Sequence, residues 1–105
     1  MNNVFSDRER AFETEFACQG EKAFRLSSQA IRSLARWAAG EMGLNAEASM
    51  IYVRRAGDLA VEPDAVSRME SRLLADLKAS GIDMTEGRIR LKYQRYLAQA
   101  RAAAL

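Results

Sequence analysis

Residues 66–82 read VSRMESRLLADLKASGI and contain the clearest apolar stripe in the chain. Its apolar side chains recur every three or four residues, which is the period of one face of an α-helix. They are Val66, Met69, Leu73, Leu74 and Leu77. Gly81 follows as a left-handed residue after the helix, and Ile82 is placed to pack back on Leu77 in a Schellman ending. The stretch therefore predicts an amphipathic helix that stops at Gly81.

Two start signals lie on the N-terminal side of this helix. Pro63 suits the first position of a helix, so we expect the helix to begin there behind a Glu62 cap. Val61 and Val66 are spaced as a hydrophobic staple around that cap. Earlier in the chain, Asn45 is a favourable N-cap for a helix that runs to about residue 59. Residues 60–62 then form a short joint between the two helices.

A longer helix is predicted over residues 21–42. Gly43 is placed as the left-handed residue after this helix, and Leu44 is placed to fold back on its last turn. The apolar residues of this helix share one broad face. They are Phe24, Ile31, Leu34, Ala38 and Met42.

The last helix begins after Thr85, which is a good N-cap, with Met84 and Ile89 as its staple. Its inward face consists of Ile89, Tyr93, Tyr96, Leu97 and Ala100. The joints over residues 43–44, 60–62 and 81–84 are short, so consecutive helices become antiparallel neighbours. We therefore predict an all-α protein, with an antiparallel four-helix bundle over residues 20–105.

Residues 1–19 form a separate amphipathic arm in this prediction. Ser6 and Glu9 fit a capping box, so a helix opens at Ser6, runs over residues 6–19 and is hinged near Gly20. Three aromatic residues at spacings of seven and four, Phe5, Phe12 and Phe16, share one side of it. The stripe suits two roles: a first helix packed on the chain's own core, or a helix that docks into a groove of another protein.

The composition excludes most catalytic chemistry. The 105 residues contain no histidine and a single cysteine, Cys18, which excludes catalytic triads, histidine-ligated metals and disulfides within the chain. Carboxylate pairs such as Glu13 with Glu15, and Glu62 with Asp64, fall on faces that the pattern predicts to be solvated. We therefore predict a protein that is not an enzyme, with no catalytic residue, no metal site and no cofactor.

Charge gives little support to nucleic-acid or membrane binding, because the net charge is only +2. The last helix is basic, and a nucleic-acid or nucleotide site on it is a weaker alternative to a solvated face. Its basic residues are Arg88, Arg90, Lys92 and Arg95. No secretory signal or stretch long enough to span a membrane is present, and the lone thiol favours a reducing compartment, so we expect a cytoplasmic protein.

The N-terminal residues resemble a known family. Phe5-Ser6-Asp7-Arg8-Glu9-Arg10-Ala11-Phe12-Glu13, followed by Glu15-Phe16-Ala17, is similar to the opening of the alphaproteobacterial ATP synthase zeta subunit family of ATPase inhibitors. Phe24 with Trp37-Ala38-Ala39-Gly40 resembles a later segment of the same family, and Glu62-Pro63-Asp64 and residues 74–83 also match in order. The resemblance covers nearly the whole chain.

The resemblance implies a regulatory protein, monomeric when free, that binds the catalytic head of the F-type ATP synthase. The arm enters a catalytic interface beside the central stalk and blocks ATP hydrolysis while synthesis proceeds. The implied partner-binding residues are Phe5, Asp7, Arg8, Glu9, Arg10, Phe12 and Phe16. The phenylalanines are apolar anchors, the arginines pair with acidic groups, and the carboxylates support the start of the helix.

The chain departs from the family pattern within the arm. Ser6 stands in place of an acid, and Glu15 stands in place of a lysine, which reverses a charge. Charge changes at the rim of an interface alter affinity and specificity. The alternative function is therefore a helical adaptor that keeps the bundle, does not inhibit, and binds another protein.

Overall fold

The computed structural model describes the backbone of residues 4–105 and the side chains of residues 19–105. Over these residues it consists of four α-helices and no strand: α1 (Val4–Glu41), α2 (Ala46–Leu59), α3 (Ala65–Ala79) and α4 (Glu86–Ala103). The predicted all-α fold is confirmed.

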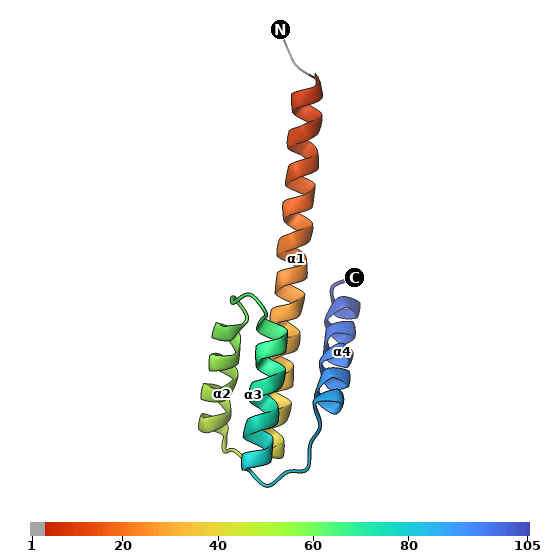
Figure 1. Cartoon of the computed structure of the whole chain (residues 1–105). Helices are drawn as coiled ribbons and strands as arrows, with labels where there is room; N and C mark the ends of the chain where they lie inside the picture. The colour runs from red at the N-terminus through yellow and green to blue at the C-terminus, as the bar shows by residue number, and fades with distance from the viewer. Residues whose placement is uncertain (1–3) are drawn as a thin grey trace.

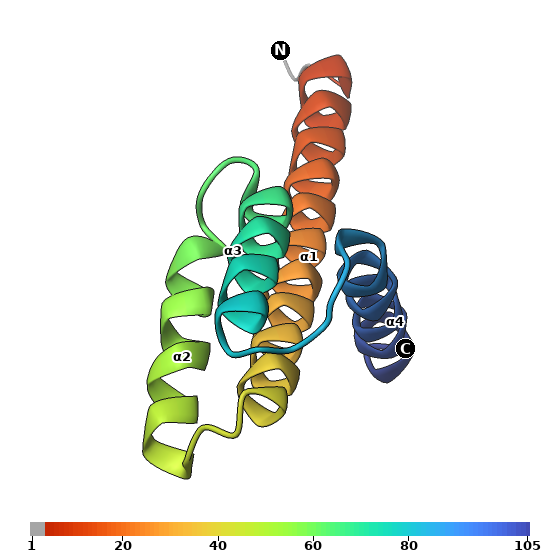
Figure 2. The same ribbon diagram turned by 60° about the horizontal axis from the view of Figure 1, so that its bottom comes forward.

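The helices gather around the second half of α1 (Figure 1). α1 contacts each of the other three helices, and α3 contacts both α2 and α4. In Figures 1 and 2, α1, α2 and α3 run in alternating directions. α4 runs against α1 in Figure 1 but along it in Figure 2, so α4 crosses α1 obliquely. The short joints thus give alternating directions among the first three helices, while the fourth is inclined to them.

The core lies where α1, α3 and α4 meet. Its fully buried large side chains come from these three helices: Ile31, Leu34, Met69, Leu73, Leu77 and Ile89. Small residues fill the rest of the buried face of α1 and its contact with α2, and include Ala35, Ala38 and Ala56. The apolar stripe predicted for residues 66–77 therefore supplies the centre of the core.

The helix ends follow the local signals closely. Asn45 accepts a hydrogen bond from the Ala48 amide at 2.8 Å, and Thr85 accepts one from the Arg88 amide at 3.2 Å, so both predicted N-caps are confirmed. α3 ends in a Schellman motif in which the Ile82 amide donates to the Leu77 carbonyl at 3.0 Å. α1 ends in the same way, and its Leu44 amide donates to the Ala39 carbonyl at 3.0 Å.

The predicted start of α3 is wrong. α3 begins at Ala65 and not at Pro63, and its N-cap is Asp64, whose φ of 62° is left-handed. Val61 is 68% exposed, so it forms no staple with Val66. After α2 the chain keeps turning, and the Glu62 amide donates to the Leu59 carbonyl at 3.0 Å. Asp64 then reverses the backbone, which aspartate tolerates better than most residues with a side chain.

The predicted break in the first helix is also wrong. α1 is continuous over 38 residues and passes through Gly20 without a hinge. It already includes Val4 and Phe5, so Ser6 is not its N-cap. A single glycine costs a helix only about 1 kcal/mol relative to alanine. The helix-forming residues on both sides of Gly20 outweigh that cost.

Polar contacts tie the helices together at three places. The Tyr52 hydroxyl donates to Asp76 Oδ2 at 2.6 Å and joins α2 to α3. The Arg90 guanidinium donates to the buried Glu70 carboxylate at 3.3 Å and joins α4 to α3. The hydroxyls of Ser27 and Tyr93 lie 3.1 Å apart and join α1 to α4. Each bond thus links two helices whose apolar faces also meet in the core.

We expect Leu73→Ala to destabilise the fold by about 2–5 kcal/mol, because it leaves a cavity at a side chain with no exposed area. Leu91→Ala is the matched control, since Leu91 is 67% exposed and its loss should change stability by less than about 0.5 kcal/mol. Urea denaturation followed by circular dichroism measures both. Equal effects of the two variants would show that the assigned core is wrong.

We expect Tyr52 to make stability fall at alkaline pH. Burial, and then the hydrogen bond to Asp76, raise the pKa of the Tyr52 hydroxyl above its usual 10.0. Its contribution is therefore complete below the pKa of the unfolded chain and is lost as the pH rises towards the folded pKa. Tyr52→Phe should reduce the decline in unfolding free energy between about pH 9 and pH 12. An unchanged decline would contradict the assignment.

Candidate functional site

The first part of α1 projects beyond the ends of the other three helices (Figure 1). All residues over 19–25 are exposed, and the first buried position is Ser28. The molecule measures 69 Å along its longest axis and 28 and 26 Å along the others. Its radius of gyration is 17.9 Å, whereas a compact chain of this length has roughly 13 Å. The projecting helix therefore dominates the shape of the protein.

The helical backbone of α1 covers every candidate residue that the sequence assigned to partner binding. These are Phe5, Asp7, Arg8, Glu9, Arg10, Phe12 and Phe16. Their side chains lie outside the part of the chain whose side chains the structure describes, which begins at Gln19. Because the backbone is helical there, the spacings of seven and four between the phenylalanines are spacings along a single helix.

Phe24 is not a core residue, contrary to the prediction. It is 48% exposed and lines a shallow hollow with Gly20, Glu21 and Arg25, all on α1 itself. Ile31 lies seven residues later, on the same side of the helix, and is buried. Periodicity identifies a helix face, but it does not tell where the neighbouring helices stop. Phe24 is thus an exposed aromatic residue on the projecting helix.

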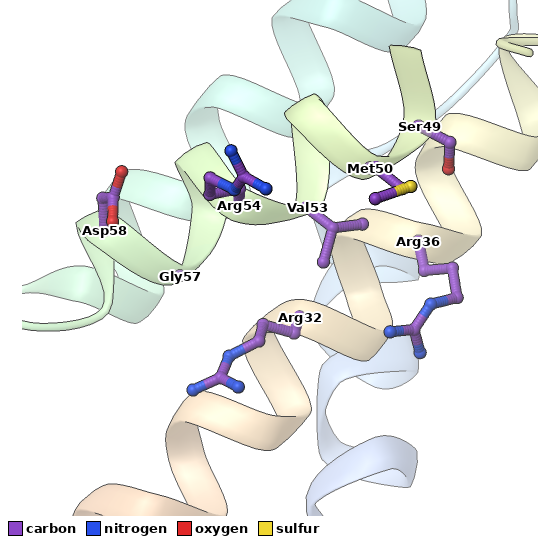
Figure 3. A pocket seen from close by; sticks show the side chains of 8 residues that line it. All are labelled: Arg32, Arg36, Ser49, Met50, Val53, Arg54, Gly57 and Asp58. Atoms are coloured by element: carbon purple, nitrogen blue, oxygen red, sulfur yellow. The ribbon is translucent and has the colours of Figure 1, made fainter. Parts of the chain in front are cut away.

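A second surface feature lies between α1 and α2 and was not found from the sequence. It is an open groove of about 470 Å³ (Figure 3). Its lining residues are Arg32 and Arg36 of α1, with Ser49, Met50, Val53, Arg54, Gly57 and Asp58 of α2. The arginines come from two helices, so no local sequence pattern brings them together. We call this feature the arginine groove.

Three features are absent from the described part of the chain. Residues 19–105 contain no group of three histidine, cysteine, aspartate or glutamate side chains that could hold a metal ion. Among these residues no buried side-chain nitrogen or oxygen lacks a hydrogen-bond partner. None of the helices described over residues 4–105 has both the length and the hydropathy needed to cross a bilayer.

Fold and surface together define a small all-α protein with one long projecting helix. The chain belongs to the family described as ATPase inhibitor subunit zeta, whose family model matches residues 1–103. The resemblance seen in the sequence is confirmed, and it assigns the chain to a family of regulatory, non-catalytic proteins. No curated protein and no solved structure matches the chain.

We expect substitutions at Gly20 to act on the projecting helix alone, because, apart from the adjacent backbone of α1, no atom of the side chains described over residues 19–105 lies within 4 Å of a Cβ added there. Gly20→Ala should favour the helix by about 1 kcal/mol, and Gly20→Pro should break it. Backbone NMR shifts of residues 4–18 should become more helical in the first variant and lose helical character in the second. The melting temperature of the bundle should stay the same, and a fall as large as that of Leu73→Ala would show that the segment is part of the core.

Proposed function

We propose that this protein inhibits ATP hydrolysis by the F-type ATP synthase, and that its N-terminal helix inserts into the catalytic head. One observation carries the proposal: a chain of the ATPase inhibitor zeta family has a first helix that continues well beyond the bundle. A helix whose backbone projects beyond the bundle is placed to reach a partner. The bundle then serves as the body from which this helix extends.

The residues of the arm suit insertion into a protein groove. Phe5, Phe12 and Phe16 supply apolar anchors, and burying three phenylalanines contributes on the order of 5–9 kcal/mol. Association itself costs roughly 4–15 kcal/mol in lost translational and rotational freedom, which offsets much of that gain. The arm alone therefore binds weakly, and a tight complex also requires contacts made by the bundle.

Charged residues of the arm complete the proposed contact. Arg8 and Arg10 pair with acidic groups of the catalytic head, where charge-assisted hydrogen bonds fix the orientation of the helix. Asp7 and Glu9 lie near the N-terminus of α1, where the helix dipole favours negative charge. Asp7 and Glu9 therefore favour the helical state of the arm, and Arg8 and Arg10 give the arm specificity for an acidic partner.

We divide the chain into an inhibitory arm over residues 1–19 and a bundle over residues 20–105. The exposed stretch of α1 extends past this boundary to Arg25, so the proposed contact surface includes Phe24. In this proposal the arm lies beside the central stalk and stops rotation in the hydrolysis direction only. The protein acts on the cytoplasmic side and associates peripherally with the membrane-bound enzyme.

The test is ATP hydrolysis by the isolated catalytic head from the same organism. Full-length protein should inhibit it, and removal of residues 1–19 should abolish inhibition while the bundle keeps its melting temperature. Full hydrolysis with saturating protein would reject the inhibitor proposal. Binding to the head without inhibition would support the adaptor instead. A truncated chain that fails to fold would show that the arm belongs to the core.

We expect Phe12→Ala and Phe16→Ala each to raise the half-inhibitory concentration by roughly 10- to 100-fold, because each removes an anchor that contributes about 1.5–3 kcal/mol. Leu91→Ala is the matched control, since this exposed leucine lies on α4, away from the arm. Titration of hydrolysis against each variant measures the effect. Loss of a phenylalanine without any change in inhibition would exclude it as an anchor.

A further inference from the structure

The arginine groove is lined by arginines that take part in none of the ion pairs found among residues 19–105. The ion pairs among residues 19–105 join Arg72 to Asp76, and Arg90 to Glu70 and Glu86. None of them involves Arg32, Arg36 or Arg54, and all three of these arginines are exposed. Asp58 is the one acidic residue that lines the groove. The groove therefore carries an excess of positive charge.

This concentration of charge works against folding. Arg32 and Arg36 are four residues apart on α1, and like charges at that spacing destabilise a helix. Arg54 of α2 adds a third positive charge to the lining, and Asp58, one turn later on the same helix, supplies the one negative charge (Figure 3). An anionic ligand or protein segment would offset this repulsion.

The bottom of the groove is apolar. Met50 is 64% exposed, and Figure 3 shows Met50 and Val53 between the arginines of α1 and the backbone of α2. Gly57 lies at one end of the groove, where a Cβ built on it would be 3.5 Å from Arg32 Nε, an ordinary contact distance. Alanine would therefore fit at this position.

The length of the groove favours an extended ligand. Lining residues of α2 run from Ser49 to Asp58, a distance of about 14 Å along that helix. An apolar strip edged by arginines matches a helix that has apolar residues on one side and carboxylates beside them. A single small anion would leave Met50 and Val53 uncovered.

We propose that the arginine groove docks an acidic amphipathic helical segment on the surface of the catalytic head. The inference rests on the proposed function and supplies the bundle contact that a weakly binding arm requires. Arg32 follows Phe16 by 16 residues on the same continuous helix, so the acidic segment should lie about 24 Å from the site of Phe16.

Charge reversal tests the groove against a matched surface. One variant combines Arg32→Glu, Arg36→Glu and Arg54→Glu. The control combines Arg68→Glu, Lys78→Glu and Arg101→Glu, which make the same change in net charge at exposed positions outside the groove. Titration calorimetry measures the affinity of each for the isolated catalytic head at low and high salt, and hydrolysis assays measure inhibition.

The groove variant should bind at least about tenfold more weakly, while the control changes by less than about threefold, because exposed ion pairs contribute modestly each and add over three positions. The affinity of the groove variant for the catalytic head should also depend less on salt than the affinity of the natural chain. Inhibition at saturation should remain complete, since the arm is intact. If the triple variant does not fold, the single variants Arg32→Glu and Arg54→Glu should each weaken binding about threefold.

A photo-crosslinking residue at position 50 identifies the docked segment, and mass spectrometry of the crosslinked head should recover a peptide rich in aspartate and glutamate. Equal affinity of the groove and control variants, or crosslinks to a segment without carboxylates, would overturn the groove proposal and leave the inhibitor proposal standing. A natural chain that does not bind the head at all would overturn both.

Discussion

The second half of α1 packs against α2, α3 and α4, and this packing holds the four helices together. Ile31 and Leu34 are buried there among the leucines of α3 and the Ile89 side chain of α4. Starting a helix is unfavourable, whereas extending one adds a hydrogen bond for each residue that is fixed. The buried half of α1 acts as a permanent nucleus, so the first half of the helix needs only to propagate from it. A segment that would be marginal as a free peptide is thus helical as the continuation of a buried helix.

The predictable parts of the fold are those encoded within a few residues. The apolar stripe from Val66 to Leu77 and the caps at Asn45 and Thr85 depend on neighbouring positions, and all of them were confirmed. The start of α3 was missed, because the left-handed Asp64 arises from the need to turn the chain back after α2. The hinge predicted at Gly20 was wrong, because the cost of one glycine in a helix, about 1 kcal/mol relative to alanine, is small beside the stability of the whole helix.

Surface features were harder to predict, because they depend on how separate helices are placed relative to one another. Phe24 has the spacing of a core residue, but its exposure depends on where α2, α3 and α4 end, which no residue of α1 encodes. The arginine groove joins residues more than 15 positions apart, from Arg36 on α1 to Arg54 on α2. By contrast, the family was recognisable from the first 17 residues, since a sequence motif can be recognised without knowledge of the fold. The sequence thus identified the family, whereas the arginine groove became visible only in the folded structure.

The continuity of α1 has a mechanical consequence. A rod of 38 residues without a joint cannot relieve a load by bending at one weak point. A force applied at its tip is carried along the backbone into the packing around Ile31 and Leu34. The stiffness of the projecting part of α1 therefore depends on the cohesion of the four-helix core, and a defect deep in that core would soften the tip some tens of ångströms away.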